Sequence, residues 1–406
     1  MSEAYVRPLP FSPGTVPLAA RTVLRLLERL AHGTLILEGP GGFATRFGTG
    51  DPVAHLAIRD WRVIGESLSG GDIAFAECYF DGRWNSADPA RLVELFCLNR
   101  DTMDGAVYGT FIGSIAHRLR HWLNRNTRAG SRRNIAAHYD LGNNFYGLWL
   151  DASMTYSSGL FLPGADTLAE AQVAKYRRIV ERIAPSTSDH VLEIGCGWGG
   201  FAETFLTGSR ARLTGLTLSR EQLDYARARL RTRGLGDRAD LRFMDYRDLE
   251  GRFDHIVSIE MFEAVGEAYW DGYFACLSRH LAPAGRALVQ TITIDDALFA
   301  RYRKGTDFIQ QYVFPGGMLP SPAEFRRRAK AAGLEVTDAF TFGRDYARTL
   351  RMWREAFMAR RLEVLAQGFD ERFLRLWEFY LAYCEGAFNA RSTDVVQFEL
   401  RHQGVA

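Results

Sequence analysis

The sequence predicts an α/β protein with a doubly wound parallel sheet, preceded by a small α+β domain. Between residues 191 and 294, short apolar runs alternate with amphipathic helical segments, a pattern that favours a parallel sheet. The first apolar run ends in a glycine-rich turn that leads into a helix. The 406 residues, 47% hydrophobic and 24% charged, are enough for about two domains with ordinary globular cores.

Residues 1–112 are predicted to form the small α+β domain. We expect a helix over residues 22–31, strands over 33–47 and 55–58, and a helix from Trp61 to about Gly71. A compact aromatic segment follows at residues 73–84, and another helix at 88–100. This domain is expected to serve lipid engagement or self-association, for example in a homodimer.

A basic segment, residues 113–133, is predicted to link the two domains. Residues 116–133 contain no acid, and their basic side chains are interleaved with Trp122 and two histidines. A solvated linker is one interpretation. Contact with an anionic membrane is the other, since a basic residue near such a surface contributes about 1 kcal/mol, and nucleic acid would also suit the run. The arginines are Arg118, Arg120, Arg125, Arg128, Arg132 and Arg133.

Residues 134–406 are predicted to hold the doubly wound sheet. Strands are expected from residue 191 and over 211–218, 240–244, 253–259, 287–294, 334–341 and 395–401. Helices are expected over 134–150, 165–184, 221–233, 269–281, 321–332, 347–367 and 370–388. Residues 295–320 are too long and aromatic for a plain connector, so we interpret them as a lid or pocket wall.

The turn Gly195-x-Gly197-x-x-Gly200 after the first strand predicts a nucleotide-like ligand, held by free backbone N–H groups and a helix N-terminus. This spacing also fits a dinucleotide site. Glu193 within the strand instead favours a cofactor with an ammonium group, and residues 213–219 lack the acid that would bind a ribose. Acid-x-Gly-x-Gly is typical of S-adenosylmethionine (SAM) methyltransferases; a glycine turn in an unrelated α/β domain is the alternative.

Polar residues after the later strands fit the same cofactor. Asp245 is expected to bind the adenine amino group, with Tyr246 packing on the ring, and Thr217 and Gln222 are expected to bind ribose or methionine groups. Each alone could be a surface polar residue; together they favour cofactor binding.

Two carboxylates, Glu260 and Glu263, follow the fourth strand in an apolar frame. Glu263 is placed to act on a proton or a developing cation, although a helix-capping role is the alternative. Enzymes that methylate amino groups of bases use an Asn/Asp-Pro-Pro-aromatic turn at this position. The chain lacks that turn, so nucleic acid is not the expected substrate.

Several motifs together resemble the cyclopropane-fatty-acyl-phospholipid synthase family, which includes the mycolic acid cyclopropane and methyl-branch synthases. The resemblance runs from about residue 70 to the C-terminus. The motifs, in family order, are Tyr79-Phe-Asp-Gly-Arg-Trp84, His138-Tyr-Asp-Leu-Gly142, Met154-Thr-Tyr-Ser157, Glu193-Ile-Gly-Cys-Gly-Trp-Gly-Gly200, Thr217-Leu-Ser219 with Gln222, Met261-Phe-Glu263, Phe314-Pro-Gly-Gly317 with Leu319-Pro-Ser321, and Asp345-Tyr346.

The resemblance implies a class I SAM methyltransferase with a Rossmann-like sheet and helices inserted over the active site. It implies methyl transfer from SAM to the double bond of an unsaturated acyl chain in a membrane phospholipid, through a carbocation. Loss of a proton then gives a cyclopropane, or alternatively a methyl-branched alkene. A homologue that binds SAM or lipid without catalysis is the further alternative.

The resemblance also implies site residues. Tyr156 and Ser157 match residues that close over SAM, and His138 also matches, as a catalytic or a helix-packing residue. Aromatic faces can stabilise a cation, and the candidates are Tyr312, Phe314 and Tyr346.

In the family, a bicarbonate ion serves as the base. Of the residues that hold it, Glu263, Ile292 and Tyr346 match, whereas Ser158 replaces a cysteine and Gln290 a histidine. Glutamine cannot relay a proton as histidine can, so the resemblance implies the methyl transfer and leaves the identity of the base open.

The cysteine pattern and the N-terminus bear on location. The five cysteines contain no C-x-x-C pair, and no signal peptide or membrane-spanning run is visible. We therefore expect a cytoplasmic protein, peripherally associated with the membrane, without a metal site.

Overall fold

The computed structural model describes residues 16–102 and 141–404. The predicted basic linker and His138 lie outside the described residues. Contacts divide the chain into two units, which we call the N-terminal unit (residues 1–121, 305–313 and 357–392) and the large unit (122–304, 314–356 and 393–406). The predicted division was into residues 1–112, 113–133 and 134–406. The N-terminal unit differs from it because it also includes two stretches from later in the chain.

The N-terminal unit contains a four-stranded sheet in the order β2-β1-β3-β4, in which β1 and β3 are parallel. Helices from the C-terminal half of the chain complete this unit, because α17 packs against both α3 and α2. Its elements are α1 (Leu18–Leu27), β1 (Gly33–Gly39), η1 (Pro40–Gly42), β2 (Phe43–Thr49), β3 (Val53–Ile58), α2 (Arg62–Phe80), β4 (Trp84–Asn85), α3 (Pro89–Leu98), α13 (Phe308–Tyr312), α16 (Arg361–Ala366) and α17 (Glu371–Asn389).

The close approach of α17 to α3 depends on a glycine. A Cβ atom at Gly386 would lie 2.7 Å from the carbonyl oxygen of Ala90 and 2.7 Å from Cβ of Val93. Only a residue without a side chain therefore allows this packing.

The helix expected to end near Gly71 has a non-helical break at that residue, where φ is 66° and ψ is -147°. A second helical stretch of α2 follows and runs to Phe80, where the sequence predicted only a compact aromatic segment. Its buried side chains include Ile73, Ala76 and Phe80. The single helix expected over residues 347–367 is divided into α15 (Gly343–Ala359) and α16.

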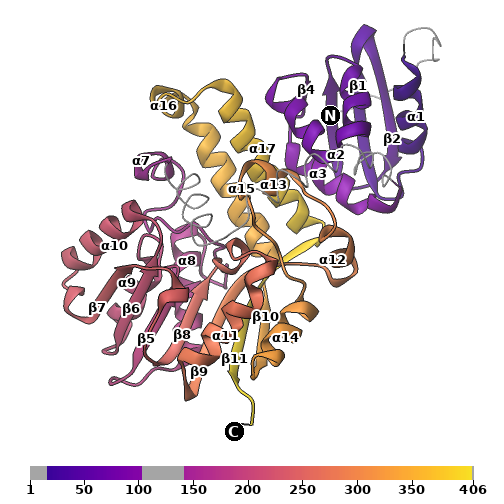
Figure 1. Cartoon of the computed structure of the whole chain (residues 1–406). Coiled ribbons are helices and arrows are strands. Elements are labelled where there is room, and N and C mark those ends of the chain that lie inside the picture. Colours follow the sequence, from indigo (N-terminus) through magenta and orange to yellow (C-terminus); the bar gives the residue numbers. More distant parts are fainter. Residues whose placement is uncertain (1–15, 103–140, 405–406) are drawn as a thin grey trace. The chain divides into compact units, whose positions relative to one another are not determined.

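The large unit contains a seven-stranded sheet in the order β10-β11-β9-β8-β5-β6-β7 (Figure 1). Its elements are α7 (Asn143–Tyr146), α8 (Leu168–Ile183), β5 (His190–Ile194), α9 (Gly200–Gly208), β6 (Arg212–Thr217), α10 (Arg220–Thr232), η2 (Gly236–Arg238), β7 (Ala239–Phe243), η3 (Tyr246–Asp248), β8 (Phe253–Ile259), η4 (Phe262–Ala264), η5 (Glu267–Tyr269), α11 (Trp270–His280), β9 (Leu281–Ile294), α12 (Asp296–Tyr302), α14 (Pro322–Ala331), β10 (Leu334–Thr341), α15 as far as Ala356, and β11 (Thr393–His402).

Five adjacent strands, β7, β6, β5, β8 and β9, are parallel as predicted, but β11 is antiparallel to both β9 and β10. The register pairs Thr393 with Ile294. Strand β11 therefore starts beside the end of β9 and runs back along it. The predicted doubly wound fold is confirmed, with the antiparallel strand β11 as a correction.

Two apolar cores cover the two faces of the sheet. One joins α8, α9 and α10 to strands β5 and β6, and the other joins α11 and α14 to β8, β9 and β11. Local sequence fixes where these helices begin. Thr167 and Glu170 form a reciprocal capping box at the start of α8, and Ser321 caps α14.

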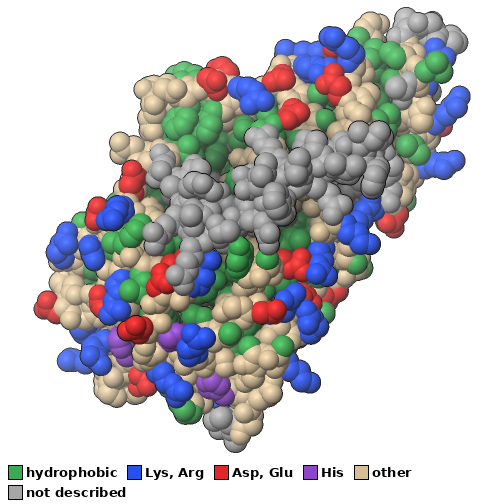
Figure 2. Space-filling view, in the orientation of Figure 1, with side chains coloured by type: hydrophobic (Ala, Val, Ile, Leu, Met, Phe, Trp, Pro, Cys, Tyr) green, Lys and Arg blue, Asp and Glu red, His purple; other side chains and the backbone are tan. Residues whose placement is uncertain are grey.

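No helix in the described part of the chain is long and apolar enough to cross a membrane. On the face shown in Figure 2, acidic and basic side chains intermingle over the large unit.

Replacing Phe325 by alanine tests the core beneath α14. This side chain is fully buried, and its ring stacks on Phe398 at a centroid distance of 4.1 Å. We expect the free energy of unfolding, measured by urea titration, to fall by about 3–5 kcal/mol. The control Leu162→Ala, at a side chain that is 46% exposed, should change it by less than about 0.5 kcal/mol. Equal effects of the two substitutions would contradict the assignment of this core.

Candidate active site

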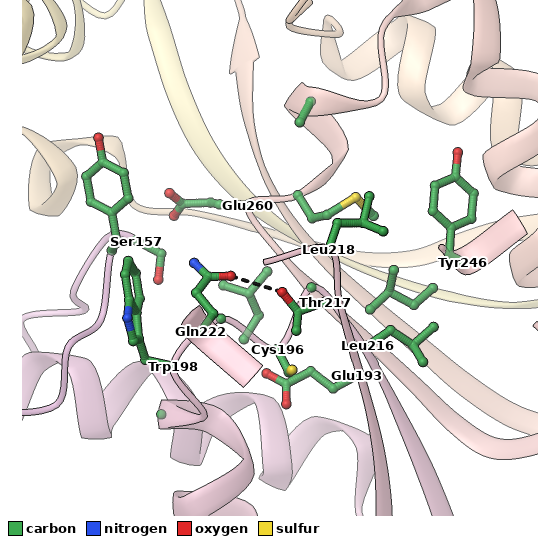
Figure 3. A pocket seen from close by; sticks show the side chains of 18 of the residues that line it. Ser157, Glu193, Cys196, Trp198, Leu216, Thr217, Leu218, Gln222, Tyr246 and Glu260 are labelled. Carbon is green, nitrogen blue, oxygen red and sulfur yellow. Dashed lines mark hydrogen bonds between the residues drawn. The ribbon is translucent and has the colours of Figure 1, made fainter. Parts of the chain in front are cut away.

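A cavity of about 160 Å³ lies at the carboxyl ends of β5, β6, β7 and β8 in the large unit (Figure 3). Ligands of open α/β sheets bind at this edge. All nine residues predicted to bind the cofactor line the cavity: Tyr156, Ser157, Glu193, Gly195, Gly197, Thr217, Gln222, Asp245 and Tyr246. The structure thus brings together side chains that are up to ninety positions apart in the sequence.

The glycine turn after β5 forms one wall. Gly195 and Gly197 have φ values of 86° and 50°, in the region that favours glycine. The N–H groups of Gly195 and Cys196 donate to the carbonyl oxygen of Leu216, at 2.9 and 2.8 Å. The prediction that this turn offers free N–H groups was therefore wrong for these two residues, because they fasten the turn to β6.

Glu193 is buried beside this turn, with 2% of its surface exposed. Burial raises the pKa of its carboxyl group to about 8. Within the described residues, its Oε2 atom has no hydrogen-bond partner. A buried carboxylate oxygen without a donor is costly unless a ligand supplies one, so the cavity is suited to a cationic group here.

Thr217 and Gln222 are joined across the cavity floor. The Thr217 hydroxyl donates to Gln222 Oε1 at 3.0 Å, and itself accepts the Ser219 N–H. Figure 3 shows the Gln222 amide nitrogen on the side of Ser157, with Tyr246 at the other end of the cavity. The amide N–H groups of Gln222 are thus placed to donate to a ligand.

Asp245 lines the cavity but is already paired. Its carboxylate accepts from Arg247 Nε at 2.8 Å and from Arg247 Nη2 at 2.6 Å, and its side chain is 1% exposed. A ligand amino group would therefore share Asp245 with Arg247, a partner that the sequence pattern did not reveal.

Three of the five predicted catalytic residues converge on a carboxylate that was not in the predicted set. Glu260 Oε1 accepts from the Ser158 N–H at 2.9 Å and from Gln290 Nε2 at 2.7 Å. Glu260 Oε2 accepts from the Tyr346 hydroxyl at 2.6 Å. Glu260 itself lines the cavity (Figure 3).

The backbone at Glu260 explains how its side chain reaches this place. Its φ is 49°, a conformation that costs a non-glycine residue about 1–3 kcal/mol and that clusters at functional sites. The surrounding protein raises the pKa of its carboxyl group, while nearby Lys175 and the three donors oppose that rise. Gln290 is held in turn, because its Oε1 accepts from Gln397 Nε2 at 2.9 Å.

The other two predicted catalytic residues form a separate pair. Glu263 Oε1 accepts the Ile292 N–H at 2.5 Å, and Glu263 Oε2 is buried without a hydrogen-bond partner among the described residues. Burial and the neighbouring charge of Glu260 raise the pKa of Glu263 to about 8. Ser158 takes part through its backbone, because its hydroxyl donates to the Gly159 carbonyl oxygen.

Three aromatic residues are candidates to stabilise a cation. Tyr312 belongs to the N-terminal unit, where its hydroxyl donates to Glu77. Phe314 is not part of the cavity wall. Of the three candidates, Tyr346 is the one bonded to Glu260.

Comparison with known proteins assigns this arrangement to a family. The family model described as mycolic acid cyclopropane synthetase matches residues 126–398. The chain belongs to this family.

Individual relatives support the assignment. The chain is 37% identical over 416 residues to the tuberculostearic acid methyltransferase UfaA1 of Mycobacterium tuberculosis, covering 96% of this chain and 93% of that protein. It is 33% identical over 365 residues to the cyclopropane-fatty-acyl-phospholipid synthase of Escherichia coli K12, covering 86% and 88%. The crystal structure of the mycolic acid cyclopropane synthase CmaA1 complexed with SAH and CTAB matches with a TM-score of 0.63 and 30% identity, covering 66% and 97%.

This member of the mycolic acid cyclopropane synthetase family is a SAM-dependent methyltransferase, and its cavity fits SAM. Bound SAM supplies an electrophilic methyl group carried on sulfur. Glu193 would hold its ammonium group, and Gln222 would donate to a hydroxyl or carboxylate. At Gly195 a Cβ atom would lie 3.0 Å from Cγ of Met261, so glycine keeps this wall close to the ligand.

Glu193→Gln tests the ammonium contact. Removing a charge-assisted hydrogen bond should raise the Kd for SAM, measured by isothermal titration calorimetry, by about 10- to 100-fold. The matched control Glu221→Gln, at an exposed position on α10, should leave the Kd within about twofold. An unchanged Kd in Glu193→Gln would remove this residue from the cofactor site.

Proposed function

We propose that this enzyme transfers the methyl group of SAM to the double bond of an unsaturated acyl chain in a membrane phospholipid, giving a methyl-branched chain. The names of two full-length relatives, a tuberculostearic acid methyltransferase and a cyclopropane-fatty-acyl-phospholipid synthase, support a fatty acyl substrate. The first name denotes methylation rather than ring formation, and that relative is similar to 96% of this chain.

The proposed reaction adds one methylene unit to the lipid. The alkene electron pair forms a bond to the methyl carbon while the bond between that carbon and sulfur breaks, and its electrons leave with sulfur in S-adenosylhomocysteine. The other alkene carbon becomes a carbocation. A base then removes one proton. If the electrons of that C–H bond form a double bond, the product is a methyl-branched alkene; if they close a ring, it is a cyclopropane. An alkene is a weak nucleophile, so both routes need tight positioning and exclusion of water.

The observation that carries the proposal is Glu260, a carboxylate within the cofactor cavity that could take this proton. General bases must lie within reach of the proton they remove and have a pKa near the working pH. The enclosure of Glu260 raises its pKa, and hydrogen bonds from Gln290, Tyr346 and the Ser158 N–H fix its position.

The residues present do not fit a bound bicarbonate ion. Ser158, Gln290 and Tyr346 were predicted to hold that ion, but their donors already bind the carboxylate of Glu260. We therefore propose that the protein's own carboxylate is the base, and no step requires an added anion.

Substitutions at Glu260 test this assignment. Glu260→Gln should lower kcat about 100-fold or more while the Kd for SAM stays within about threefold. Glu260→Gly removes the carboxylate and suits the φ of 49°, so its activity should be low and restored in part by added bicarbonate or formate. Glu263→Gln tests the other carboxylate, which matches a family residue that holds the base. Loss of turnover in Glu263→Gln with full turnover in Glu260→Gln would reverse the assignment.

The product can be identified after incubation with unsaturated phospholipid vesicles and labelled SAM. Ring and branch have the same mass, so mild catalytic hydrogenation should precede gas chromatography–mass spectrometry of the released methyl esters. A methyl-branched alkene takes up two hydrogens, whereas a cyclopropane resists mild conditions. We expect uptake; a labelled product that takes up none would establish the cyclopropane as the product.

We also propose that the N-terminal unit engages lipid at an anionic membrane surface. A cavity of about 150 Å³ in this unit is lined mainly by aliphatic and aromatic side chains. On α1, Leu18 is 81% exposed, and two arginines lie on the same helix. These features support contact with acyl chains and with acidic head groups. Representative cavity residues are Val23, Leu27, Leu37, Leu56, Ile64 and Phe96.

A further inference from the structure

Lys175 on α8 is a buried cation that the proposed reaction has not used. Its side chain is fully buried, and lysine is almost never buried to this extent unless it is paired. Its Nζ atom donates to Ser157 Oγ at 2.5 Å and to Gln172 Oε1 at 2.6 Å. Both acceptors are neutral, and among the described residues no carboxylate lies at ion-pair distance from Lys175. Any favourable interaction of this positive charge with a carboxylate is therefore with one that lies beyond ion-pair distance.

That partner is Glu260. Of the carboxylates around Lys175, Glu260 has the largest electrostatic effect on its ammonium, followed by Asp151. In return, Lys175 is the largest electrostatic influence that favours the charged form of Glu260. Burial lowers the pKa of Lys175 to about 7, so this lysine is charged in acidic solution and loses its proton as the pH rises through that value.

A short backbone segment connects the two groups. Ser157 Oγ accepts from Lys175, and the N–H of the next residue, Ser158, donates to Glu260 Oε1. Ser157 and Glu260 both line the cofactor cavity, whereas Lys175 lies behind the wall. The ammonium thus acts on the cavity from a position that a ligand does not reach.

We infer that Lys175 is a positioning residue whose buried ammonium keeps the Glu260 carboxylate ionised and ready to accept a proton. This inference rests on the proposed role of Glu260 as the base. Without the cation, an enclosed carboxylate next to a second acid, Glu263, would favour its protonated form. The other titratable groups around the pair are Glu263 and Tyr346 beside Glu260, and Asp151 and Tyr176 beside Lys175.

The test is the pH dependence of kcat with saturating SAM and unsaturated phospholipid vesicles, compared between Lys175→Gln and Lys175→Arg. Glutamine keeps amide donors for Ser157 and Gln172 but has no charge, so the acid limb of the profile should move to higher pH, by about 1–3 units. Arginine keeps the charge, so its acid limb should stay near that of the wild type. Calorimetry of SAM binding should show a Kd within about threefold in both variants.

Glu260→Gln separates this inference from the proposed function. An unmoved acid limb in Lys175→Gln, together with loss of turnover in Glu260→Gln, would overturn the role of Lys175 and leave the base in place. Full turnover in Glu260→Gln would overturn the base itself. If Lys175→Gln fails to fold, Gln172→Leu is informative: it removes a hydrogen bond of Lys175 but not its charge, so a limb shift there would contradict the inference.

Discussion

The active site depends on how the protein treats carboxylates that it removes from water. Removing a carboxylate from water favours its neutral form, and only donors or nearby cations oppose this. The large unit encloses Glu193, Glu260 and Glu263 at one edge of the sheet, and each is treated differently. Glu193 has an oxygen without a protein donor, Glu260 has three donors and a cation behind the wall, and Glu263 has one backbone donor. The three carboxylates therefore differ in how strongly the protein itself favours their charged form.

The sheet provides the rigidity that this arrangement needs. Glu260 follows directly on β8, and Gln290 lies within β9, which pairs with β8 on one side and β11 on the other. Gln397 on β11 extends the chain of amides by donating to Gln290. The antiparallel strand β11, paired with β10 on one side and β9 on the other, therefore supports the site, and a loop could not hold the amide so firmly.

Much of the fold and the cofactor site could be predicted because both follow local patterns. Alternating strands and helices indicate the sheet, and residues after successive parallel strands meet at one edge, which is why Glu193, Thr217 and Asp245 line one cavity. The placement of the Glu260 side chain could not be predicted this way, because it depends on a backbone conformation, with φ of 49°, that is unfavourable for any residue with a side chain. A signal was present, since an acid stands directly after an apolar strand.

Lys175 illustrates the other limit of sequence reasoning. Helix α8 is rich in charged residues, so its sequence predicts that Lys175 is exposed. Lys175 is buried because the segment that contains Ser157 packs over it. The pairing of Asp245 with Arg247 was missed for a related reason. An acid and an arginine two positions apart can point in different directions, and the turn after β7 decides that they meet.

The N-terminal unit is assembled from three separate stretches of chain. Helix α17 packs closely against α3 at Gly386, which has no side chain. A single protease cut in the region between the units would therefore not release two independent fragments, since the C-terminal fragment would still carry α17. Shortened forms that begin after the basic segment would expose a helix face shaped to meet α3. Evolution of this chain by fusion or domain exchange is correspondingly constrained: the front segment and α17 have to change together.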